Sequence, residues 1–238
     1  MGKRLELSPR LQQLADWVPQ GAAFADVGTD HALLPVWLVR TGRVRQCIAS
    51  DLRPEPLRRA RETAKLWDVS GIGFRLCDGL SGIRPEEAGT IAIAGLGGEN
   101  IVSILQKAAW TRDGQHVLLL QPMTRVETLR RYLSDNGYEI RREALARERG
   151  ILYPVMEVAG GTMYLTPGQC YGGAKLSRDP WADRYYIEKI LRLQNALAGM
   201  NRGKRGSGDP AQADALRDII TELLVMREEW RYANRAGD

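Results

Sequence analysis

The chain has 238 residues, of which 44% are hydrophobic and 26% are charged, and its formal net charge is +5. This composition is that of a folded globular protein and excludes a wholly disordered chain. No apolar run reaches the roughly 18 residues that cross a bilayer, and the first residues lack the apolar stretch of a secretory signal. We therefore expect a soluble, cytoplasmic protein, and its positive charge favours a polyanionic partner such as a nucleic acid.

The first half of the chain alternates between predicted helices and strands. A helix is predicted from Ser8 to just before Pro19, because Pro9 suits a first helical turn and the following apolar residues share one face. A strand at 22–28 leads into a helix that ends near Gly42. Further strands are predicted at 46–50, 73–77, 90–94 and 116–120, and further helices at 54–67, 99–110 and 125–135.

Two patterns define the fold class. The uninterrupted apolarity at 90–94 indicates a strand that is buried on both faces, as in a parallel sheet. The segment 138–160 alternates instead and contains Gly150, which favours a closing antiparallel pair. Strand–helix alternation that ends in a hairpin predicts a Rossmann-like, doubly wound α/β domain over residues 1–160.

Residues 161–238 are predicted to form a second, smaller domain. Apolar residues recur at helical spacing from Trp181 to Met200 and again from Leu216 to Trp230. A linker rich in glycine, arginine and lysine separates the two stretches. This pattern predicts an antiparallel helical hairpin that resembles a coiled coil.

The loop after the first predicted strand combines two acids with one glycine. Ligands of an open parallel sheet bind beyond the carboxyl ends of its strands, so this loop is a candidate site. It lacks the G-x-G-x-x-G sequence of a dinucleotide phosphate site and has only Gly28. Asp26 and Asp30 would repel phosphate and attract a cation. The loop therefore favours S-adenosylmethionine, with its sulfonium and ammonium groups, over NAD.

The loops after the second and third strands supply carboxylates suited to a nucleoside. Asp51 stands where a carboxylate accepts hydrogen bonds from ribose hydroxyls. Asp78 can accept a hydrogen bond from an adenine amino group, and Leu80 can contact the ring. Either acid alone is equally expected as a helix cap. Their equivalent positions at neighbouring strand ends favour a ligand site.

The loop after the fourth strand, at 94–98, contains three glycines within four residues. Such a loop permits positive φ angles and a close approach of the backbone to a ligand. The alternative is a tight turn before the next helix. The sequence Asn-Pro-Pro-Tyr, which is associated with methylation of exocyclic amines, does not occur at this position, so transfer to such an amine is disfavoured.

Together these segments resemble the bacterial tRNA (adenine-22 N1)-methyltransferase family. The resemblance covers residues 5–160 and rests on LSPRLQQLA, ADVGTDHALLP, SDL, CDGL, IAIAGLGG, LLQPM and ERGILYPVMEV, in this order and spacing. It implies a class I methyltransferase domain with a C-terminal helical hairpin. It also implies transfer of a methyl group from S-adenosylmethionine to N1 of adenine 22 in the tRNA D-arm.

The resemblance places the cofactor at the first helix and at the four strand-end loops. The residues predicted for cofactor binding, from these loops and from the resemblance together, are Arg10, Asp26, Gly28, His31, Asp51, Leu52, Asp78, Gly79, Leu80, Gly95, Leu96, Gly97 and Gly98. Arg10 would pair with the cofactor carboxylate, Asp51 with the ribose and Asp78 with the adenine. Two departures from the family pattern stand out. Asp51 replaces a frequent Glu, and Met123 replaces an Asn that follows Gln-Pro, which alters any contact of that position with the target base.

The expected methyl transfer depends on the orientation of the adenine and the methyl donor, and it needs no general base. Adenine N1 has an in-plane lone pair, so attack on the methyl group requires no prior deprotonation. The product is cationic, and a carboxylate that faces the adenine amino group would stabilise the transition state. Asp30 is the candidate for that role. His31 as a general base is the alternative, and a purely structural role for His31 is equally expected.

The expected macromolecular partner is tRNA, bound by a basic surface and by the C-terminal hairpin. Candidate basic contacts are Arg58, Arg59, Arg61, Arg130, Arg131, Arg202, Lys204 and Arg205. Dimerisation or stability is the alternative role of the hairpin, and a monomer is favoured. Cys47, Cys77 and Cys170 lack the spacing of a zinc site or a disulfide framework, and we expect buried thiols and no metal. Two alternatives stay open: a methyltransferase for a small molecule or protein, and a non-catalytic RNA-binding protein with this fold.

Overall fold

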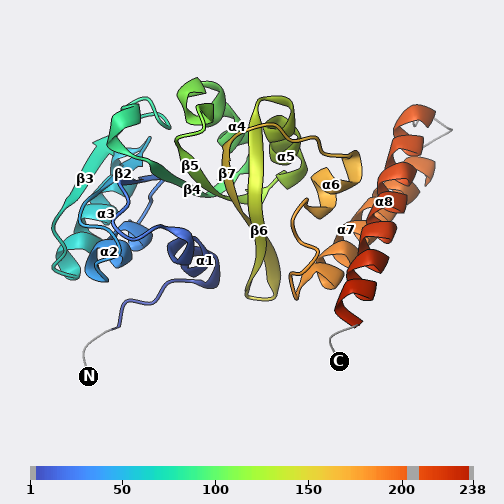
Figure 1. The fold of residues 1–238 in the computed structure, drawn as a ribbon, viewed down its shortest axis with the longest axis horizontal. Coiled ribbons are helices and arrows are strands. Elements are labelled where there is room, and N and C mark those ends of the chain that lie inside the picture. Colours follow the sequence, from blue (N-terminus) through green and yellow to red (C-terminus); the bar gives the residue numbers. More distant parts are fainter. Residues whose placement is uncertain (1–3, 203–208, 236–238) are drawn as a thin grey trace. The chain divides into compact units, whose positions relative to one another are not determined.

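A computed structural model of the protein describes residues 4–202 and 209–235. The chain divides into two compact units, Met1–Met163 and Tyr164–Asp238, and its elements are shown in Figure 1. Within the described ranges, the helices lack the length and apolarity needed to cross a membrane. We describe each unit by itself.

Unit 1 is built on a seven-stranded sheet with the order β3-β2-β1-β4-β5-β7-β6 (Figure 1). The strands are β1 (Phe24–Val27), β2 (Cys47–Asp51), β3 (Ile72–Leu76), β4 (Thr90–Gly97), β5 (Val117–Thr124), β6 (Tyr138–Glu148) and β7 (Ile151–Gly160). Strands β1 to β5 pair in parallel, whereas β7 pairs antiparallel with both β5 and β6. The predicted Rossmann-like α/β class and its closing antiparallel pair are confirmed.

The helices of unit 1 cover both faces of the sheet, with α1 to α3 on one face and α4 and α5 on the other (Figure 1). They are α1 (Pro9–Trp17), α2 (Leu33–Arg40), α3 (Pro54–Leu66), α4 (Gly98–Gln106) and α5 (Val126–Asp135), with short 3-10 helices η1 (Pro85–Glu87) and η2 (Ala109–Arg112). The prediction of one helix over 99–110 was wrong. Ala108 leaves the helical region, with φ −128° and ψ 60°, and the chain continues into η2.

The centre of unit 1 is a core that joins the sheet to its first two helices. All residues of β1 and β2 are buried. Phe24 of β1 belongs to a cluster with Leu14 of α1, Leu38 of α2, Leu119 of β5 and Val155 of β7. Each such side chain contributes about 1.5–3 kcal/mol when it is fully buried. This core fixes the ends of the strands. The strand order reverses at β1, which lies between β2 and β4, and the connections that follow these strands run to opposite faces of the sheet. Ligands of such sheets bind at this point.

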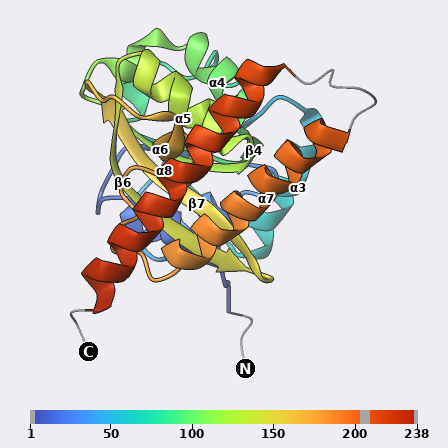
Figure 2. The same cartoon turned by 90° about the vertical axis from the view of Figure 1, so that its right-hand side faces the viewer.

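Unit 2 consists of α6 (Pro167–Gly172), α7 (Ala182–Arg202) and α8 (Pro210–Arg235). The long helices α7 and α8 run side by side (Figure 2), as expected for the hairpin. An ion pair of 2.8 Å joins Arg227 Nε to Asp183, and the indole of Trp230 donates to the carbonyl of Asp179 at 2.9 Å. The sequence did not predict α6. Its first turn is held by Glu222 of α8, which accepts a hydrogen bond from the Gly168 amide at 3.0 Å.

Candidate functional site

Two adjoining cavities lie at the carboxyl ends of the central strands. Pocket A, of about 290 Å³, is lined by residues from α1, from the loop after β1 and from the glycine-rich end of β4. The prediction of a loop at 94–98 was wrong, because β4 stays paired with β5 as far as Gly97 and α4 begins at Gly98. Pocket B, of about 350 Å³, is lined by the loops after β2 and β3 and by α4. The two pockets share Gly28, Asp51, Arg53 and Leu96. They therefore form one divided site at the place where the strand order reverses.

Most of the residues predicted for the site meet there. Those that line pocket A are Arg10, Asp26, Gly28, Asp30, His31, Asp51, Gly95 and Leu96. Those that line pocket B are Gly28, Asp51, Leu52, Asp78, Gly79 and Leu96. Cys77 also lines pocket B and is half-buried, so the prediction that it is buried was wrong.

Three predicted residues lie outside the lining of both pockets, as the described residues define it. Leu80 is buried, with 4% of its surface exposed. At Gly98, the backbone of Arg125 occupies the space that a Cβ would need. A Cβ at Gly97 would lie 3.2 Å from the Thr124 hydroxyl. These contacts indicate that the two glycines allow α4 to start tightly against the end of β5.

Asp26 is the buried acid at the base of pocket A. Its side chain accepts a hydrogen bond of 2.6 Å from the Thr29 hydroxyl. Burial raises the pKa of Asp26 to about 6, the Thr29 hydrogen bond opposes this, and the nearby charge of Asp51 adds to it. The carboxylate is thus poorly compensated within the protein, and a cation in pocket A would stabilise its ionised form.

Asp51 ties together the loops after β1 and β2. Its Oδ1 accepts a hydrogen bond of 3.0 Å from the Arg53 amide, and its Oδ2 accepts a longer one of 3.4 Å from the Asp30 amide. The residue is buried, yet it lines both pockets. Its carboxylate is therefore fixed at the junction of the two cavities, where it can accept further hydrogen bonds from a ligand.

Two exposed acids at the pocket rims pair with basic residues 29 positions away in sequence, and one of these acids also lies near its neighbour His31. Asp30 Oδ1 lies 2.6 Å from Arg59 Nη2, and Asp30 Oδ2 lies 3.6 Å from His31 Nε2. The Asp78 carboxylate accepts a hydrogen bond of 2.6 Å from Lys107 Nζ. The sequence predicted Arg59 only as a candidate RNA contact and assigned nothing to Lys107. The ion pairs with Asp30 and Asp78 could not be predicted, because only the fold brings these residues together.

Arg10 reaches pocket A from the first turn of α1. Its Nε donates to Glu148 Oε2 at 3.0 Å, and its Nη1 donates to Gln121 Oε1 at 2.9 Å. The amide of Gly95 donates to the same Gln121 oxygen at 3.2 Å. The sequence analysis includes Gln121 in the segment LLQPM but predicts no role for it. A glutamine inside a hydrophobic strand was the available signal, because a buried amide requires partners.

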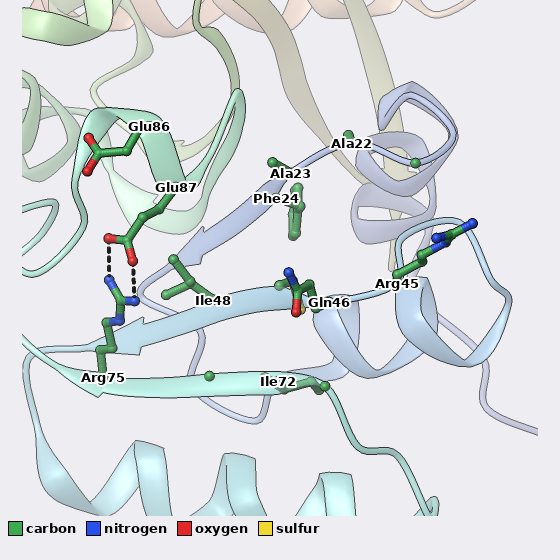
Figure 3. A pocket seen from close by; sticks show the side chains of 14 residues that line it. Ala22, Ala23, Phe24, Arg45, Gln46, Ile48, Ile72, Arg75, Glu86 and Glu87 are labelled. Atoms are coloured by element: carbon green, nitrogen blue, oxygen red, sulfur yellow. Dashed lines mark hydrogen bonds and ion pairs between the residues drawn. The ribbon is translucent and has the colours of Figure 1, made fainter.

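A larger cavity, of about 930 Å³, lies at the opposite edge of the sheet, at the amino ends of β1, β2 and β3 (Figure 3). Two of its charged lining residues satisfy each other, since Arg75 donates to both carboxylate oxygens of Glu87, at 2.8 and 2.7 Å. The rule that ligands bind at the carboxyl ends of parallel strands favours pockets A and B as the functional site.

The donor set of pockets A and B fits S-adenosylmethionine. In pocket A, Asp26 offers a negative charge for an ammonium, and Arg10 offers a positive one for a carboxylate. Asp51 stands between the pockets with oxygen acceptors suited to ribose hydroxyls. Pocket B joins the apolar side chain of Ile104 to the acceptor of Asp78, which suits an adenine ring and its amino group.

Comparisons with known proteins agree with this assignment. The model of the family described as "Methyltransferase domain" matches residues 7–156. A putative tRNA methyltransferase of Mycoplasma pneumoniae is 34% identical over 202 residues, which are 81% of this chain and 91% of that protein. The tRNA (adenine(22)-N(1))-methyltransferase of Bacillus subtilis is 36% identical over 158 residues, which are 66% of each chain. This chain belongs to the tRNA (adenine-22 N1)-methyltransferase family.

Solved structures extend the family likeness over both units. A putative tRNA (m1A22) methyltransferase of Streptococcus pneumoniae is 30% identical, with a TM-score of 0.81 over 93% of this chain and 100% of that one. A second structure of that protein is a complex with S-adenosyl-L-methionine, with 29% identity, a TM-score of 0.80 and the same coverage. The resemblance expected from the sequence motifs is confirmed.

The basic residues that were predicted to contact RNA differ in exposure and in their partners within the protein. Arg130 was a wrong choice, because it is fully buried and its Nε lies 2.8 Å from Glu143. Arg58 is exposed but pairs with acids on both sides along α3. Arg61 stacks over the Phe74 ring at 4.9 Å. Arg131 is exposed on α5, whereas Lys204, Arg205 and the side chain of Arg202 lie outside the described residues.

Proposed function

We propose that this protein transfers the methyl group of S-adenosylmethionine to N1 of adenine 22 in the tRNA D-arm. Family membership supports the reaction and its substrate. The observation that carries the proposal is the divided site at the strand ends, where a poorly compensated buried acid, Asp26, shares pocket A with Arg10. This pairing of charges matches the zwitterionic end of the cofactor.

Each pocket has its own part in binding. Pocket A takes the methionine end of the cofactor, with Asp26 toward the ammonium and Arg10 toward the carboxylate. Pocket B takes the adenosine end, with Asp51 at the ribose and Asp78 at the adenine. When bound, the cofactor supplies an electrophilic methyl group. The residues of the chain then act by orienting the donor and by excluding water.

Asp30 is our candidate catalytic residue. Adenine N1 attacks with its own lone pair and becomes cationic, so a carboxylate near the adenine amino group lowers the energy of the transition state. Asp30 is exposed at the rim of pocket A, and its ion pair with Arg59 holds one oxygen in place. The second oxygen, near His31, is the one that we assign to the substrate. His31 has a positioning role in this scheme, because no base is required.

The proposal extends to the tRNA itself. A base within the tRNA core must leave its stack to reach the donor, which requires phosphate contacts over an extended surface. We assign those contacts to exposed basic residues such as Arg131 and to the hairpin of α7 and α8. We further propose that the protein acts as a monomer in the cytoplasm, where its substrate is found.

The test is a methylation assay on defined RNA. Purified protein and radiolabelled S-adenosylmethionine are incubated with a tRNA transcript that has adenine at position 22, and with a matched transcript that has guanine there. We expect label only in the first, with the product mapped to position 22 by primer extension and mass spectrometry. Absence of label in both transcripts and in bulk tRNA would overturn the proposal, and label in a small molecule or protein would favour the alternative substrates.

A further inference from the structure

The guanidinium of Arg10 is held from two sides. Glu148, at the end of β6, accepts from Nε at 3.0 Å, and Gln121, in β5, accepts from Nη1 at 2.9 Å. A guanidinium carries five N–H donors in a rigid fork, so the two bonds fix its plane while other donors remain for a ligand in pocket A. Arg10 is about one quarter exposed, with a side-chain accessibility of 23%.

The amide of Gln121 can have only one orientation here. Its Oε1 accepts from two donors, Arg10 Nη1 and the Gly95 amide at 3.2 Å. Its Nε2 donates to the carbonyl of Pro122 at 3.1 Å and faces the sulfur of Met123 at 3.5 Å. A flipped amide would set N–H groups against N–H groups. Because Gln121 is fully buried, water cannot replace these partners.

The backbone amide of Gly95 needs a side-chain acceptor, and Gln121 supplies it. The register of β4 and β5 passes from the pair Ala94–Gln121 to the pair Leu96–Pro122, so Gly95 is the bulged residue. Its φ of +74° suits glycine, and a Cβ there would lie 3.4 Å from Arg10 Nη1. The amide of this bulge is bound by Gln121. One buried side chain of β5 thereby links α1 to the bulge of β4.

From this network we propose that Gln121 and Glu148 are positioning residues that hold Arg10 toward the carboxylate of the cofactor. The inference rests on the proposed function, since it assigns the methionine end of S-adenosylmethionine to pocket A. Neither residue lines pocket A or pocket B as the described residues define them, so their effect on the ligand must pass through the lining residues that they bind, which are Arg10 for both and Gly95 in addition for Gln121.

The test compares two ligands by calorimetry. S-adenosylhomocysteine has the amino-acid carboxylate, and 5′-methylthioadenosine lacks it. Gln121→Met keeps a long unbranched side chain but cannot accept from Arg10, and we expect the Kd for S-adenosylhomocysteine to rise about tenfold or more. The Kd for 5′-methylthioadenosine should stay within about twofold. The same change made in an Arg10→Ala background should add far less than it does in the wild type, because only its contact with the Gly95 amide is then left to lose.

Glu148 gives an independent pair of variants in case Gln121→Met fails to fold. Glu148→Ala should weaken S-adenosylhomocysteine selectively, and Glu148→Gln should restore much of the loss because it retains an oxygen acceptor. Equal weakening of both ligands, or full additivity with Arg10→Ala, would overturn the inference. Failure of the proposed function looks different: the wild-type protein would bind S-adenosylhomocysteine and methylate no tRNA.

Discussion

Replacement of Asp26 by asparagine should separate stability from cofactor binding. The pKa of Asp26 is raised from 3.8 to about 6, chiefly by burial. Between these two values the folded protein binds more protons than the unfolded chain. The contribution of Asp26 to the free energy of unfolding therefore falls as the pH rises through 6. A neutral asparagine removes this cost of burying a charge, while it also removes the partner for the cofactor ammonium.

The size of both effects follows from the same shift. A difference between 3.8 and about 6 corresponds to about 3 kcal/mol at pH 7, which is the upper limit of the stability that Asp26→Asn can gain in the ligand-free protein. With a pKa of about 6, the ionised fraction of Asp26 falls about tenfold between pH 7 and pH 5. If the cofactor ammonium binds only the ionised form, the Kd should rise about tenfold over the same range. In Asp26→Asn the Kd should be higher and insensitive to this pH range.

The assay is titration of S-adenosylhomocysteine between pH 5 and pH 7, together with urea denaturation at pH 7. The ligand ammonium stays protonated over this range because α-amino groups have pKa values of about 8. 5′-Methylthioadenosine, which lacks the ammonium, serves as the control ligand. Asp16→Asn, an exposed acid on α1, serves as the control variant. A wild-type Kd that does not change with pH, or a loss of stability at pH 7 in Asp26→Asn, would refute the reasoning.

Three further substitutions test other parts of the structure. Asp30→Asn should lower kcat by about tenfold to a hundredfold and leave the Kd for S-adenosylhomocysteine nearly unchanged, and an unaltered kcat would remove Asp30 from the mechanism. Arg130→Met should cost about 3–5 kcal/mol in urea denaturation because it leaves Glu143 buried without this partner, and Glu143→Met in the same chain should recover most of that loss. Gly98→Ala should destabilise the protein by more than about 1 kcal/mol, since backbone fills the space of its Cβ, and a neutral effect by thermal melting would contradict the packing described above.

The sequence was a good guide wherever its signals are local. Uninterrupted apolar runs revealed β1, β2 and β4, and acids at or near the carboxyl ends of parallel strands identified Asp26, Asp51 and Asp78. Position along a strand is enough in those cases, because parallel strand ends share one edge of the sheet. The predicted fold class and family were correct for this reason.

The partners of those acids were beyond sequence reasoning. Asp30 and Arg59 are 29 residues apart, and Arg10 is 138 residues from Glu148, so no local spacing relates them. Arg130 carries a charge and sits on a helix, and only the packing of α5 shows that its side chain points inward. Helix α6 was missed because two glycines weaken its propensity, while a carboxylate from α8 supports its first turn.

The ion pair between Arg10 and Glu148 also sets an order of assembly. The five parallel strands end at Thr124, yet the β6–β7 hairpin that carries Glu148 must follow before Arg10 gains its second anchor. All residues that line pocket B precede residue 105, so they leave the ribosome before Glu148 does. Because contacts so distant in sequence form slowly, the carboxylate end of the pocket is expected to mature last during folding.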